Sequence, residues 1–121
     1  MTRIVLVEDD PAVRSVVEIL LSTEPDLELV GSSASAEEGI ELVRDLAPDL
    51  VMLDYQLEGA LTGVAAAPLV RAVAPRVLVL LCTALDLAAV AAAEPAIDGY
   101  LRKDSLADLV EVVRALLDRP A

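Results

Sequence analysis

The chain has 121 residues, of which 56% are hydrophobic and 2% aromatic, so aliphatic side chains must fill the core of the single domain that we expect over residues 1–121. Nine basic residues against 21 acidic ones give a net charge of −12, which disfavours direct binding of nucleic acid or of an anionic membrane surface. The lone Cys82 excludes an internal disulfide, and without a secretory segment or a membrane-length apolar run we expect a cytoplasmic protein.

Aliphatic runs alternate along the chain with segments of helical periodicity. The runs predict strands at Arg3–Val7, Leu27–Ser32, Leu50–Leu53, Val77–Cys82 and Gly99–Leu101. The periodic segments predict helices at Pro11–Thr23, from Ser35 to a stop at Pro48, from about Gly63 to Val73, over Leu87–Ala93 and from Ser105 onwards. Three of the runs are continuous rather than alternating, which is typical of parallel strands covered on both faces.

Capping residues and apolar stripes support these helices. Asp10 precedes Pro11 as a cap of the first helix, and Ser35 and Glu38 have the spacing of a capping box. The expected inward stripes are Val13, Val16, Val17, Leu20 and Leu21 in the first helix, Ile40, Val43 and Ala47 in the second, and Leu106, Leu109, Val110, Val113 and Leu117 in the last. The alanine-rich fourth helix offers little side-chain surface, so we expect it to pack weakly.

Repeated strand–helix units predict an α/β fold, a flavodoxin-like doubly wound parallel sheet with strand order 2-1-3-4-5 and five helices on its two faces. Ligands bind such sheets at the carboxyl ends of the strands, where the order reverses between strands 1 and 3. Glu8 and Asp9 follow the first strand and Asp54 follows the third. Thr83 and Lys103 follow the fourth and fifth, so we expect all five side chains at one edge.

Three carboxylates at one point repel one another unless a cation lies among them. Oxygen ligands without His or Cys favour Mg²⁺ (or Mn²⁺) over zinc or copper. A carboxylate such as Asp54 can attack phosphorus and form an aspartyl phosphate. The Lys103 ammonium and the Thr83 hydroxyl could then stabilise the charge on the phosphoryl oxygens.

The chain resembles the receiver domain of bacterial two-component response regulators. The residues that carry this resemblance are Val7-Glu8-Asp9-Asp10-Pro11, Val51-Met52-Leu53-Asp54, Thr83-Ala84 and Asp98-Gly99-Tyr100-Leu101-Arg102-Lys103-Asp104. It implies that Asp54 is the phosphoacceptor and that Asp9 and Asp54 ligate Mg²⁺ directly, with Glu8 acting through water and Gln56 through its backbone carbonyl. It also implies that Thr83 and Tyr100 are switch residues and that Lys103 contacts the phosphate.

The resemblance further implies partners. A sensor histidine kinase would supply the phosphoryl group, and the last two strand–helix units would form the surface that switches and that can pair two copies as a homodimer. Lys103-Asp104 resembles the subfamily with a C-terminal helix-turn-helix, so DNA binding would belong to an output domain outside this chain. The domain would be a signalling module rather than an enzyme, although it would assist its own phosphorylation and dephosphorylation.

Two segments depart from the family pattern. In the loop after Asp54, Glu58 stands where proline is frequent and the usual glycine comes one residue late, at Gly63. The segment between Thr83 and Lys103 is about two residues short, which leaves the bounds of the fourth helix open.

Two alternatives remain. A haloacid-dehalogenase-type phosphatase also uses an aspartyl nucleophile, but it needs a second aspartate where this chain has Gln56, and its nucleophile follows the first strand. A receiver-like scaffold that is never phosphorylated would have the same fold. A dinucleotide-binding fold is disfavoured because no glycine-rich fingerprint follows the first strand.

Overall fold

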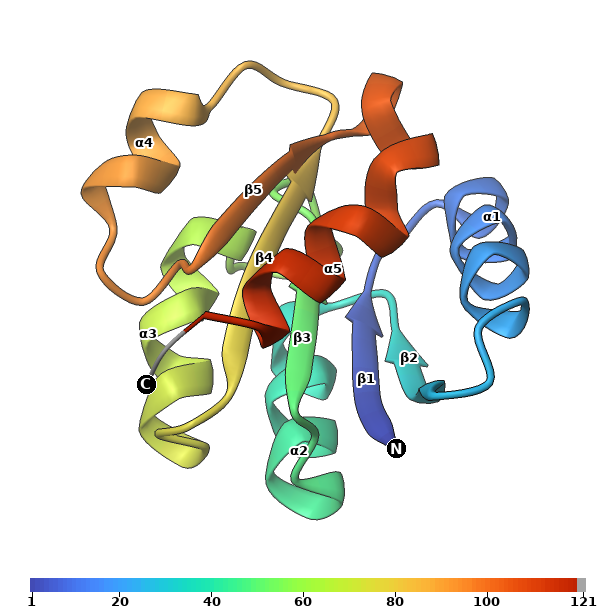
Figure 1. The fold of residues 1–121 in the computed structure, drawn as a ribbon. Helices are drawn as coiled ribbons and strands as arrows, with labels where there is room; N and C mark the ends of the chain where they lie inside the picture. Colours follow the sequence, from blue (N-terminus) through green and yellow to red (C-terminus); the bar gives the residue numbers. More distant parts are fainter. Residues whose placement is uncertain (120–121) are drawn as a thin grey trace.

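Strands and helices alternate along residues 1–119, which are the residues that this computed structural model describes (Figure 1). The strands are β1 Thr2–Val7, β2 Leu27–Ser33, β3 Leu50–Leu53, β4 Leu78–Thr83 and β5 Gly99–Arg102. They form one parallel sheet in the order β2-β1-β3-β4-β5, as predicted. The carboxyl ends of β1 and β3 are therefore neighbours in space, although the sequence separates them by a whole strand and two helices.

Two helical layers cover the sheet. The helices are α1 Pro11–Ser22, α2 Ala36–Leu46, α3 Gly63–Val73, α4 Ala88–Ala93 and α5 Leu109–Leu117. Alternate residues of each strand face opposite layers: Val5 and Val7 pack with α2, α3 and α4, whereas Ile4 and Leu6 pack with α1 and α5. The continuous aliphatic runs thus reflect burial on both faces.

The bounds of β4 and β5 differ from the predicted bounds by one residue. β4 includes Thr83, which pairs with Arg102, so β5 also extends beyond Leu101. Val77 belongs instead to the preceding turn, where its amide donates to the Ala74 carbonyl. Thr83 is consequently fixed by the sheet rather than placed in a loop.

Two residues predicted to face inward are exposed. Val16 on α1 is 43% exposed, because α1 lies at the margin of the sheet and buries only a narrow stripe centred on Val17 and Leu21. Ala47 is not in α2 but is its C-terminal cap in the left-handed conformation. The N-terminal caps agree with prediction: Asp10 accepts from the Ala12 amide and Ser35 from the Glu38 amide.

The last two strand–helix units contain short and irregular helices. The segment expected to begin the fifth helix is a 3₁₀ helix, η1 Lys103–Asp108, with non-helical dihedral angles at Ser105, and α5 begins only at Leu109. Helix α4 has six residues, no side-chain cap at its start, and Ala91 as its buried residue. Among the residues described, no helix has the length and hydropathy needed to span a membrane.

Candidate functional site

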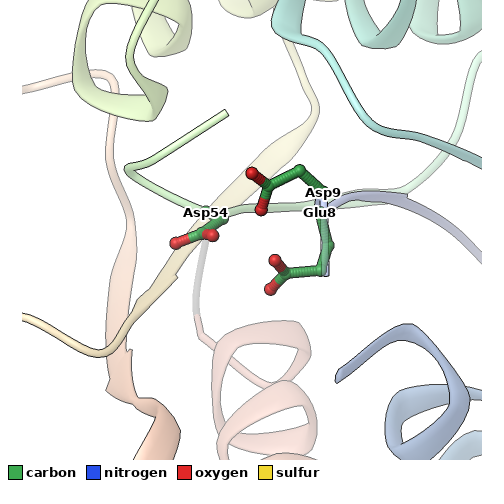
Figure 2. A group of neighbouring side chains, drawn as sticks. All are labelled: Glu8, Asp9 and Asp54. Atoms are coloured by element: carbon green, nitrogen blue, oxygen red, sulfur yellow. The ribbon is translucent and has the colours of Figure 1, made fainter. Parts of the chain in front are cut away.

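The predicted carboxylates meet at the carboxyl edge of the sheet. Glu8 and Asp9 follow β1, Asp54 follows β3, and each offers an oxygen within 4.8 Å of those of the other two (Figure 2). The backbone fixes them, because the Glu8 amide donates to the Ser33 carbonyl and the Asp54 amide to the Val7 carbonyl. Glu8 and Asp54 are buried, whereas Asp9 is partly exposed. One cation could therefore contact all three groups from the solvent side.

Lys103 enters the same cluster from the end of β5. Its Nζ lies 2.8 Å from Glu8 Oε1 and 2.9 Å from Asp54 Oδ2, so one ammonium bridges two carboxylates. Burial alone would lower the pKa of Lys103, but the hydrogen bonds to Glu8 and Asp54 outweigh this effect and raise it. The lysine is consequently held in its charged form.

The ionised form of Glu8 is destabilised despite the contact with Lys103. Burial raises its pKa to about 7, although the hydrogen bonds from Lys103 and from the Asp10 amide act in the opposite direction. A further cation in the cluster would stabilise the ionised carboxylate. Three oxygen ligands, two of them desolvated, suit a hard divalent cation such as Mg²⁺, so the residues present fit the metal that the resemblance implies.

The remaining predicted residues have their contacts outside this cluster. Thr83 is buried at the end of β4, the strand next to β3, and its hydroxyl accepts from the Leu85 amide at 3.3 Å. Tyr100 points away into the β4–α4 loop, where its hydroxyl donates to the Leu85 carbonyl and accepts from the Leu87 amide. Gln56 lies exposed, two residues after Asp54.

The loop after Asp54 has contacts that the sequence did not reveal. Gly63 begins α3 so close to Asp54 that an added β-carbon would lie 2.0 Å from the Asp54 carbonyl oxygen. Glu37 of α2 reaches across to accept from the Leu61 amide at 3.3 Å. The displaced glycine was a visible signal for the first contact, whereas nothing in the local pattern marked Glu37, a residue of an apparently solvated helical face.

Cys82 lies behind the cluster, inside the sheet. It is 4% exposed and pairs with Leu101 of β5. Burial raises the pKa of its thiol to about 12, so the side chain remains a protonated apolar filler, as predicted from its place in the most hydrophobic run.

Comparisons with known proteins agree with this arrangement. Residues 4–114 match the family of the response regulator receiver domain. The nitrate/nitrite response regulator protein NarL of Escherichia coli strain K12 is 35% identical over 103 residues, which are 84% of this chain and 47% of NarL. The response regulator protein VraR of Staphylococcus aureus strain Mu3 is 32% identical over 115 residues, which are 93% of this chain and 54% of VraR.

Solved structures give the same result. A two-component response regulator of the LuxR family from Aurantimonas sp. SI85-9A1 superposes with a TM-score of 0.88 at 33% identity, over 100% of this chain and 89% of that one. The response regulator domain of Thermotoga maritima CheB, at 22% identity, shares the fold with a TM-score of 0.85 over 99% of each chain. This chain spans about half the length of the curated relatives it matches. The chain therefore belongs to the family of response regulator receiver domains of two-component systems.

Proposed function

We propose that Asp54 accepts a phosphoryl group from the phosphohistidine of a sensor histidine kinase. An oxygen of the Asp54 carboxylate would form a bond to phosphorus as the phosphorus–nitrogen bond breaks, and the histidine would leave with its electron pair and take a proton from solvent. The observation that carries the proposal is the meeting of Glu8, Asp9, Asp54 and Lys103 at one edge of the sheet. Asp54 is held in place and its negative charge is balanced on one side by Lys103.

The neighbouring residues have separate tasks in this proposal. Asp9 and Asp54 would hold Mg²⁺, with Glu8 acting through a water molecule and the Gln56 carbonyl as a further ligand. The metal supplies positive charge to the oxygens of the phosphoryl group. Lys103 would exchange its contact with the Asp54 carboxylate for one with a phosphoryl oxygen, and Thr83 would turn its hydroxyl from the Leu85 amide toward the same group.

We extend the proposal to the switch. Tyr100 now holds the β4–α4 loop through two hydrogen bonds, and a rearrangement of Thr83 would change the position of Leu85, which contacts both side chains. The surface of α4, β5 and α5 would thereby respond to phosphorylation, either by pairing two copies or by contacting an output domain. Because the relatives are about twice as long, a DNA-binding domain beyond residue 121 is our proposed partner, in a cytoplasmic protein.

The test is phosphorylation by acetyl phosphate and Mg²⁺, followed by mass spectrometry of the intact protein. We expect wild type to gain the mass of one phosphoryl group, and Asp54→Asn to gain none. Asp45→Asn, which removes an exposed carboxylate of α2, is the matched control and should react as wild type does. An unmodified wild type would favour the unphosphorylated scaffold, and equal labelling of Asp54→Asn would place the acceptor elsewhere.

A further inference from the structure

An acidic side chain of α2, Glu37, contacts the loop between Asp54 and α3. Its beginning and end have backbone contacts: the Glu58 amide donates to the Ala34 carbonyl at 3.1 Å, and the Gly63 amide to the Tyr55 carbonyl at 3.0 Å. The exposed stretch between these two contacts carries Gly59 at φ +88°. It is Glu37 that reaches this stretch from α2.

Glu37 contacts the loop with both carboxylate oxygens. Oε1 accepts from the Leu61 amide at 3.3 Å. Oε2 lies over Gly59, where an added β-carbon would be 2.6 Å from it. The carboxylate therefore makes one hydrogen bond to the loop and lies against Gly59, and it can come this close because residue 59 has no side chain.

We propose that Glu37 is a positioning residue for the acceptor loop and that it sets how readily Asp54 is phosphorylated. The inference rests on the proposed function, since the loop carries Gln56, the proposed carbonyl ligand, two residues after the acceptor. Glu37 touches neither phosphate nor metal in this proposal. It acts by restricting the backbone that presents the Gln56 carbonyl and the Asp54 carboxylate to the cation.

Hydrogen–deuterium exchange of the loop amides gives the first readout, and it does not depend on phosphorylation. In hydrogen–deuterium exchange without Mg²⁺, Glu37→Ala should increase exchange in residues 57–63 about fivefold, as expected from the loss of one ordinary hydrogen bond. Glu37→Gln keeps an oxygen that can accept from the Leu61 amide, so it should behave as wild type. Glu38→Ala removes a charge from the same turn of α2 and serves as the control.

Metal binding and phosphorylation give the second readout. Tyrosine fluorescence reports Mg²⁺ binding through Tyr55, and acetyl phosphate reports the reaction rate. Glu37→Ala should weaken Mg²⁺ binding and slow phosphorylation, each by about threefold to tenfold on the scale of one lost hydrogen bond. Glu37→Gln should restore both, whereas a role of the charge alone would leave Glu37→Gln as impaired as Glu37→Ala.

A double-mutant cycle tests the contact with Gly59. Gly59→Ala should increase loop exchange by itself, because its β-carbon meets Glu37 and its φ is positive. In Glu37→Ala the clash is absent, so the second substitution should cost less there. Strictly additive effects, or a Glu37→Ala protein that matches Glu38→Ala in exchange and rate, would overturn the inference. A wild type that takes up no phosphate would instead overturn the proposed function, while the exchange data would still decide whether Glu37 holds the loop.

Discussion

Lys103 balances two buried carboxylates with one ammonium. It lies within 3 Å of both Glu8 and Asp54, and its own side chain is 18% exposed. Breaking a largely buried ion pair is costly because the remaining charges lose their partner while they stay desolvated. We therefore expect Lys103 to stabilise the cluster of carboxylates when no cation is bound.

Lys103→Met removes the charge but keeps most of the aliphatic stem. Without metal at pH 8, we expect a loss of about 2 kcal/mol in the free energy of unfolding, measured with urea. At pH 5 the loss should be smaller, because Glu8 is then protonated in the folded protein. Arg44→Met removes an exposed ion pair with Glu41 and should change stability by less than about 0.5 kcal/mol. Equal effects of the two substitutions would contradict the bridging role.

Glu8 should make the metal-free protein less stable as the pH rises. Its pKa is raised from 4.5 to about 7, so the folded protein binds this proton more tightly than the unfolded chain does. The stabilisation is fully present below about pH 4.5 and declines as the pH rises through about 7. Urea unfolding in EDTA between pH 5 and 8 measures the slope. Glu8→Gln should flatten it, and a slope that is the same in wild type and in Glu8→Gln would show that the pKa of Glu8 is not raised.

At the scale of elements, α4 is the least anchored helix of the described chain. It begins without a side-chain cap, and its buried residue is an alanine. The loop that leads into it is held by the two hydrogen bonds of the Tyr100 hydroxyl. At its other end, Arg71 of α3 donates to the Ala96 carbonyl and to Asp98. Helix α4 is therefore held mainly by hydrogen bonds to the segments before and after it, and its own side chains contribute little packing.

Tyr100→Phe should loosen α4 without unfolding the domain. The substitution removes one donor and one acceptor from the loop and keeps the ring that packs against the core. We expect hydrogen exchange over residues 85–93 to increase about fivefold, with little change in Tm. Tyr55→Phe is the control, because the Tyr55 hydroxyl has no hydrogen-bond partner within residues 1–119. Unchanged exchange in Tyr100→Phe would mean that α4 is held in another way.

At the scale of the whole molecule, the sheet order and the acidic site could be predicted because each depends on a strong local signal. Continuous aliphatic runs mark strands buried on both faces, and alternating units leave few topologies. The acids then fall at the crossover point of that topology. These two steps are sufficient to predict that Glu8, Asp9 and Asp54 lie together.

Features that depend on how elements approach one another could not be predicted in this way. The exposure of Val16 follows from the position of α1 at the margin of the sheet, which helical periodicity does not contain. The contact between Glu37 and the loop joins two segments whose distance is set by the packing of α2 and α3. The late start of α5 reflects the non-helical angles at Ser105, and no single residue type signals them.

The net charge of −12 should make the domain sensitive to salt. Repulsion among the carboxylates opposes the compact state, and ionic screening weakens it. In metal-free buffer at pH 8, we expect the urea midpoint to rise as NaCl increases to about 0.5 M, where the Debye length falls to a few ångströms. Ion pairs such as Arg114 with Glu24 and Asp26 weaken under the same conditions, so a falling midpoint would mean that they outweigh the repulsion.

The buried thiol of Cys82 is a natural probe of local opening of the core. Because it is the sole cysteine and its buried side chain packs in the layer between the sheet and helices α1 and α5, an alkylating reagent can reach it only when this layer opens. Alkylation kinetics would thus measure how often this layer opens, without any introduced label. Comparing unmodified and phosphorylated protein would reveal whether phosphorylation tightens or relaxes the interior beneath α1 and α5.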